Sequence, residues 1–150
     1  YQIRELQNGG EFVVLLFLAA WGNDTIAYCT GMLIGKHKMS PILSPKKSIE
    51  GLVGGIVGAA ILGALYGLYL NTYIRFSFNP VTMFPIVCGL SGAVSVIGDL
   101  AASAIKRDSG IKDYGTLIPG HGGILDRFDS IIFIAPVIYY LTVMISGGAI

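Results

Sequence analysis

The sequence predicts an all-α protein: a polytopic membrane protein with about four transmembrane helices and cytoplasmic connecting helices. Of its residues, 53% are hydrophobic and only 13% are charged, and the mean hydropathy is +0.70. Soluble domains carry roughly 25% charged residues, so this chain has too few charges to build a solvated surface easily. The 21 glycines also fit a membrane protein, because glycine permits close contact between membrane helices. At this length, residues 1–150 are expected to form one membrane-embedded domain.

The first apolar stretch, 12–35, is interrupted in its middle by Asn23, Asp24 and Thr25. An ionised aspartate at the bilayer centre costs about 2.5–3.5 kcal/mol, so such a residue usually faces a bundle interior or a wet cavity. We therefore expect Asp24 to face a polar active-site cavity. The alternative is a helix break at the membrane surface, capped by Asn23 or Asp24.

Three further apolar stretches, 51–74, 76–98 and 130–150, contain no charged residue. Each reaches the 20 residues or so that a helix needs to cross about 30 Å of hydrocarbon. Glycines recur along the stretch 51–74, which predicts a helix-packing face. With the first stretch, these segments give the four predicted spans.

Two polar connections, 36–50 and 99–129, join these spans and lie on the same side if each helix crosses once. Together they hold eight of the ten basic residues, and only Arg4 and Arg75 lie on the other side. The positive-inside rule therefore places both connections in the cytoplasm.

Acidic residues gather in the second connection at helical spacing. Asp99, Ser103 and Lys106 share one face of a helix that continues the third span, and Asp126 and Asp129 share a face of the helix leading into the fourth. Carboxylates held this close repel each other unless a proton or cation lies between them, and oxygen ligands suit Mg²⁺. The alternative is a solvated helix start stabilised by the helix dipole.

A glycine-rich turn, PGHGG at 119–123, lies between these acidic groups. Its glycines let the backbone approach an anion closely before a helix begins, although His121 by itself is as well explained as a turn residue. Basic side chains on both connections are expected either to meet phosphates or only to set the topology: Lys46, Lys47, Lys106, Arg107 and Lys112.

Together these elements resemble a known family. The runs SAIKR (103–107), KD (112–113), PGHGG (119–123) and DRFD (126–129) are similar to the signature of phosphatidate cytidylyltransferases, also called CDP-diacylglycerol synthases. Upstream, NDTIAY (23–28) and SPKKSIEG (44–51) also match the family's pattern. The resemblance extends over nearly the whole chain.

The resemblance implies the catalytic C-terminal part of an inner (plasma) membrane enzyme of phospholipid biosynthesis. Such an enzyme joins CTP to phosphatidic acid in the bilayer, giving CDP-diacylglycerol and pyrophosphate at the cytoplasmic face. It depends on Mg²⁺; a second cation such as K⁺ and a homodimeric state are left open. Family members are typically longer, with additional N-terminal membrane helices that are absent from this sequence.

The same resemblance suggests roles for individual residues. Asp99, Asp126 and Asp129 are expected to bind the metal, with Ser103 and Asp113 as further ligands or orienting groups. The full catalytic set is Asp99, Ser103, Lys106, Arg107, Lys112, Asp113, His121, Asp126, Arg127 and Asp129. The expected substrate-binding residues are Asn23, Asp24, Lys46, Lys47, Gly120, Gly122 and Gly123.

Three other functions fit part of this pattern. A CTP-dependent kinase of a polyprenol-type lipid alcohol and an ether-lipid cytidylyltransferase share the membrane setting and the nucleotide. A channel or transporter would use Asp24 and the proline-bearing helices but leaves the acidic pattern at 99–129 unexplained. Nucleic-acid binding is not expected, because the net charge is +1 and there is no basic stripe.

Overall fold

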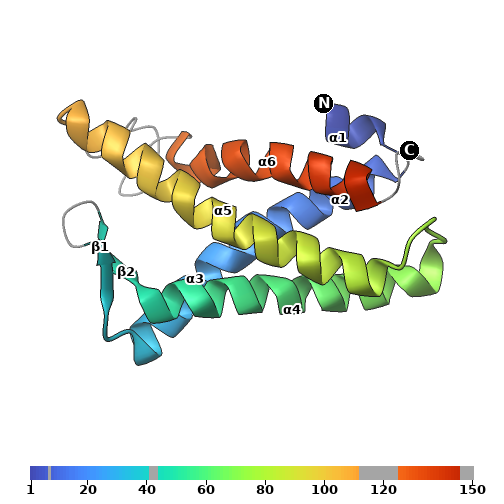
Figure 1. Ribbon diagram of the computed structural model, residues 1–150, viewed down its shortest axis with the longest axis horizontal. Helices are drawn as coiled ribbons and strands as arrows, with labels where there is room; N and C mark the ends of the chain where they lie inside the picture. Colours follow the sequence, from blue (N-terminus) through green and yellow to red (C-terminus); the bar gives the residue numbers. More distant parts are fainter. Residues whose placement is uncertain (7, 41–43, 112–124, 146–150) are drawn as a thin grey trace.

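The computed structural model describes residues 1–6, 8–40, 44–111 and 125–145, with side chains for all of these except 44–46 and 125–127. It is a bundle of long helices with a small β-hairpin at one end (Figure 1). A short helix, α1 (Gln2–Glu5), precedes the bundle.

Four helical segments are long and apolar enough to cross a membrane, as predicted. The first is continuous and consists of α2 (Gly9–Phe17), a π-helical turn η1 (Leu18–Gly22) and α3 (Asn23–Ile34). The others are α4 (Ile49–Tyr73), α5 (Pro80–Asp108) and α6 (Leu125–Ile145).

The polar residues of the first span do not break the helix. Asn23 has helical backbone angles, and α3 has no side-chain hydrogen bond at its N-cap position, which is Gly22. The π-helical turn before Asn23 carries the chain through without an interruption. The alternative of a helix break at this point is therefore wrong.

Helix α4 packs between α3 and α5, and its glycines form both contacts. A Cβ atom on Gly58 would lie 2.5 Å from the side chain of Ile26 in α3. A Cβ on Gly63 would lie 2.6 Å from the carbonyl oxygen of Phe84 in α5. Any larger residue would push these helices apart, so the predicted packing face is confirmed.

Helix α5 begins at Pro80, four residues later than the apolar stretch. Asn79 caps it by accepting a hydrogen bond from the Val81 N–H at 3.0 Å, and proline occupies the first turn, where its missing N–H costs nothing. At its other end α5 runs on through Lys106 without a break, as predicted.

The hairpin was not predicted. Its strands β1 (Lys38–Ser40) and β2 (Ser44–Ser48) pair antiparallel within the first connection. It is tied to the start of α4, because the backbone N–H of His37 donates to the Glu50 carboxylate at 3.2 Å and the His37 ring lies 2.7 Å from the same carboxylate. Ser48 then caps α4 by accepting from the Gly51 N–H at 3.1 Å.

The hairpin, the last turns of α5 and the start of α6 all lie at the same end of the bundle, here called the hairpin end (Figure 1). The α4–α5 connection lies at the opposite end. The described parts of the two polar connections are therefore on one side, as predicted. At the opposite end, Phe12 and Phe84 pack edge to face with ring centroids 5.9 Å apart, within a cluster that also holds Phe76 and Phe78.

Candidate active site

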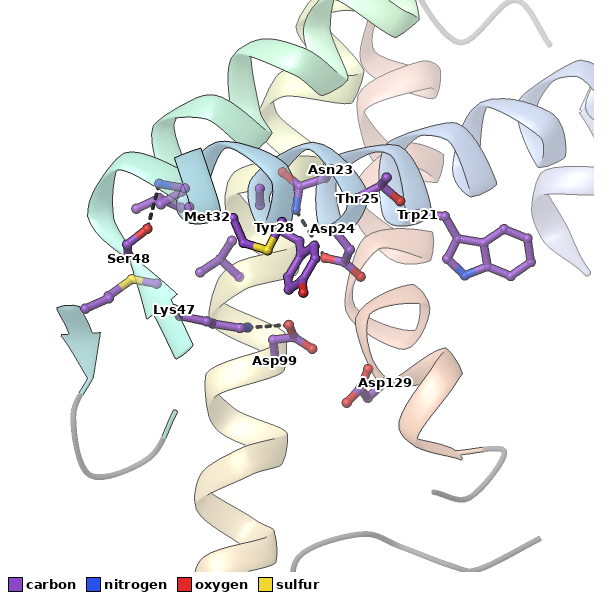
Figure 2. Close-up of a pocket in the computed structure, with 16 residues that line it drawn as sticks. Trp21, Asn23, Asp24, Thr25, Tyr28, Met32, Lys47, Ser48, Asp99 and Asp129 are labelled. Carbon is purple, nitrogen blue, oxygen red and sulfur yellow. Dashed lines mark hydrogen bonds and ion pairs between the residues drawn. The ribbon is translucent and has the colours of Figure 1, made fainter. Parts of the chain in front are cut away.

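A cavity of about 730 Å³ opens at the hairpin end (Figure 2). Helix α3 forms much of its wall, and the hairpin, α4, α5 and α6 complete it. Its charged lining consists of three aspartates and a lysine from four different elements: Asp24, Lys47, Asp99 and Asp129.

Asp99 lies at the centre of the polar contacts. One carboxylate oxygen forms an ion pair with the ammonium of Lys47, which is carried by the end of β2. The other oxygen accepts a hydrogen bond from the Ser130 hydroxyl of α6 at 3.2 Å. Because both oxygens are held, the Asp99 side chain is fixed between the hairpin and α6.

Asp129 stands on α6 next to this network. Its Oδ1 accepts from the Ser130 N–H at 2.8 Å, and its Oδ2 lies 4.0 Å from the ammonium of Lys106 on α5. The side chains of Lys106 and Asp129 are only 12% and 13% exposed, so water screens this pair poorly. Lys106 and Asp99 both contact α6, which confirms the predicted shared face of α5 for these two of its three members.

Asp24 reaches the cavity from α3, and its neighbour Asn23 is fully buried. The Asn23 amide nitrogen lies 3.5 Å from the Asp24 carboxylate. Figure 2 shows Asp24, Asp99 and Asp129 at one side of the cavity, with Lys47 reaching Asp99 from the hairpin. Among the described side chains, three acidic groups therefore lie near two basic ones, Lys47 and Lys106.

These donors suit a hard cation, which prefers carboxylate oxygens. Among the described side chains, no three His, Cys, Asp or Glu residues form a cluster tight enough to hold a metal ion. The predicted metal set cannot be completed from them, because the side chain of Asp126 lies outside the described residues. Asp99 and Asp129, the other two members, line the same cavity.

The remaining predicted residues fall into two groups. Within the described part of the chain, Ser103 and Arg107 stand on α5 beyond Asp99 but do not line the cavity, and Arg107 is exposed. The others lie outside the described residues, by their side chains or entirely: Lys46, Lys112, Asp113, Gly120, His121, Gly122, Gly123, Asp126 and Arg127.

Ser130 and the apolar wall of the cavity were not predicted from the sequence. That wall includes Trp21, Tyr28 and Met32, whose side chains are 51%, 63% and 66% exposed on the outside of the bundle. Trp21, Thr25, Tyr28 and Met32 recur at helical spacing, which would have placed their side chains on one face of a helix. The cavity therefore joins charged side chains to exposed apolar ones.

The chain was compared with known proteins. The model of the cytidylyltransferase family matches residues 2–145. The chain belongs to this family. The match covers every described helix and strand of the bundle, so all the walls of the cavity lie within the cytidylyltransferase region.

Curated relatives carry the name phosphatidate cytidylyltransferase. The one from Staphylococcus saprophyticus is 37% identical over 145 residues, which is 97% of this chain and 54% of the relative. The one from Staphylococcus aureus strain COL is 41% identical over 135 residues, or 90% of this chain and 50% of the relative. The chain thus spans about half the length of the curated relatives it matches. The family resemblance predicted from the sequence motifs is confirmed.

Proposed function

We propose that this member of the cytidylyltransferase family transfers the cytidylyl group of CTP to phosphatidic acid, giving CDP-diacylglycerol and pyrophosphate. The observation that carries the proposal is the convergence of Asp24, Asp99, Asp129 and Lys47 on one cavity beside an apolar wall. The relatives' name, phosphatidate cytidylyltransferase, supports the same acceptor and the same transferred group.

The chemistry joins two polyanions. An oxygen of the lipid phosphate attacks the α-phosphorus of CTP in line, and the bond from that phosphorus to the pyrophosphate oxygen breaks. Such transfers depend on positioning and on neutralising charge, with little covalent help from the protein. Lys47 and Lys106 are the cations that the described residues bring to the cavity or its edge. We assign them to the phosphates of the two substrates.

Magnesium fits the donor chemistry of the site, because the carboxylates of Asp99 and Asp129 both line the cavity. We propose that these two hold Mg²⁺ with Asp126, and that Asp24 lies close enough to orient the substrates or a second cation such as K⁺. Bound Mg²⁺ would neutralise phosphate oxygens during transfer. Lys47 and Ser130 would keep the Asp99 carboxylate in place.

The two proposed substrates come from different phases, CTP from water and phosphatidic acid from the bilayer, and the cavity would have to be open to both. The hairpin end carries most of the basic residues, so we propose that it faces the cytoplasm at the plasma membrane, where CTP is found. Phosphatidic acid would reach the same cavity from the bilayer, along the wall formed by Trp21, Tyr28 and Met32. The homodimeric state left open by the resemblance stays a prediction.

The test is a transfer assay in membranes that contain the protein, with CTP, Mg²⁺ and phosphatidic acid. CTP labelled at the α-phosphorus should place the label in the lipid, whereas CTP labelled at the γ-phosphorus should release it as pyrophosphate. A lipid-alcohol kinase would instead put the γ-label into the lipid and release CDP. An ether-lipid enzyme would prefer the ether-linked acceptor in a direct competition.

A further inference from the structure

Asn23 is an unusual residue for a membrane-spanning helix. Its side chain is fully buried, and its Oδ1 atom has no hydrogen-bond partner among the residues that the structure describes. Burying a carbonyl oxygen without a partner costs free energy, because the oxygen gives up hydrogen bonds that it would make elsewhere. A leucine or alanine would avoid that cost, so packing alone does not explain an asparagine here.

Two glycines on different helices make room for this amide. A Cβ atom on Gly55 of α4 would lie 2.7 Å from Asn23 Oδ1, and a Cβ on Gly92 of α5 would lie 3.0 Å from it. The oxygen therefore sits in a socket between α4 and α5. Asn23 is itself among the residues that line the cavity, as predicted, but neither glycine is, so its Oδ1 atom lies on the side of the helix contact.

The backbone on either side of Asn23 links this socket to the site. The π-helical turn Leu18–Gly22 comes directly before it, and such turns are rare and often occur at functional sites. The next residue is Asp24, which lines the cavity, and the Asn23 amide nitrogen lies 3.5 Å from its carboxylate. Asn23 therefore lies between the glycine socket and the cavity-lining Asp24.

We propose that Asn23 is a positioning residue. Seated between Gly55 and Gly92, it holds the start of α3 in the rotation that turns Asp24 toward Asp99 and Asp129. This differs from the expectation that Asn23 binds substrate directly. The kinetic part of the test rests on the proposed cytidylyl transfer, and the labelling part does not.

The kinetic test is a double-mutant cycle of Asn23→Ala and Asp24→Asn, with Gly92→Ala as a variant that keeps Asn23 but fills its socket. We expect Asn23→Ala and Gly92→Ala each to lower kcat about tenfold or more and to leave KM for CTP within about twofold. In the Asp24→Asn background, Asn23→Ala should have almost no further effect, because the two residues act through one carboxylate. A rise in KM, or an equal loss of kcat in both backgrounds, would overturn the proposal.

The second test needs no activity. In a background with Cys29→Ser and Cys88→Ala, Asp24→Cys should react readily with a membrane-impermeant thiol reagent that enters the cavity. Adding Asn23→Ala should lower that labelling rate about fivefold or more, because the thiol would be turned away from the cavity. Thr142→Val is the matched control, since Thr142 is as buried as Asn23 and its hydroxyl oxygen also has no partner in the described structure. An unchanged rate with Asn23→Ala, or the same change with Thr142→Val, would refute the positioning role even if the chain transferred no cytidylyl group.

Discussion

Lys47 at the end of the hairpin forms an ion pair with Asp99 on α5, 52 residues further along the chain. This contact ties the first polar connection to the helix that opens the second. It also puts an ammonium group beside the carboxylate that the resemblance assigns to metal binding. The hairpin, which contributes only a few residues to the fold, thereby takes part in the candidate active site.

Replacing Lys47 by alanine should reduce cytidylyl transfer about 100-fold or more. The variant removes a cation from the cavity and leaves the Asp99 carboxylate without its ion-pair partner, and lost charge stabilisation in a poorly hydrated site typically costs this much. Initial rates with α-labelled CTP would measure the effect. Lys38→Ala is the control, because Lys38 is exposed on the same hairpin and does not line the cavity in the described structure. Equal rates for both variants would remove Lys47 from the mechanism.

Asp129→Asn should abolish Mg²⁺-dependent formation of CDP-lipid while the protein stays folded in the membrane, and Asp126→Asn should do the same. The neutral amide keeps the shape of the side chain but loses the charge that a hard cation requires. Chelating Mg²⁺ in the wild type should have the same effect and should be reversed by adding Mg²⁺ back. Activity against Mg²⁺ concentration, together with the melting temperature in detergent, would separate loss of the metal from loss of the fold. Near-normal turnover in both variants would contradict the metal assignment.

Ser130→Ala should lower kcat about tenfold. The Ser130 hydroxyl donates to Asp99 at 3.2 Å, and hydrogen bonds to charged groups contribute roughly 1.5–3 kcal/mol. Ser77→Ala, at the exposed α4–α5 connection, should leave the rate unchanged. If Ser130→Ala matched that control, the hydroxyl would have no part in holding Asp99.

Gly63→Ala should destabilise the bundle, whereas Gly89→Ala should not. A Cβ on Gly63 would lie 2.6 Å from the Phe84 carbonyl oxygen, but a Cβ on Gly89 would meet its nearest neighbour, Ala60, at an ordinary 3.6 Å. Backbone atoms cannot move aside as a flexible side chain can, so the first variant forces α4 and α5 apart. We expect a fall of several degrees in the melting temperature for Gly63→Ala and about 1 °C or less for Gly89→Ala. Similar values for both would mean that the helix contact tolerates expansion.

The sequence predicted those features that depend on composition and local spacing. Four spans follow from hydropathy, and the shared face of Asp99 and Lys106 follows from helical periodicity, because the helix is continuous there. The placement of Asp24 in a cavity follows from the cost of burying a charge in hydrocarbon. The described parts of the family motifs lie at the same end of the bundle.

Contacts between distant segments could not be predicted in this way. The pairing of Lys47 with Asp99 depends on where the hairpin packs, and the hydrogen bond from Ser130 depends on how α6 faces α5. The π-helical turn is equally hidden, because the residues Leu18–Gly22 are ordinary helix formers apart from the final glycine. The hairpin was missed because its strands are short and polar and lack an alternating apolar pattern.

The glycines of α4 have a consequence for how this site can evolve. The helix contributes Gly51 and Leu52 to the cavity but separates α3, which bears Asp24, from α5, which bears Asp99. Helix α4 therefore sets the distance between α3 and α5, and this distance is short because the contacting residues of α4 are glycines. A single methyl group added to a glycine of α4 would widen the gap between Asp24 and Asp99 without touching either residue. Selection for turnover would therefore act on these glycine positions, which have no side chain.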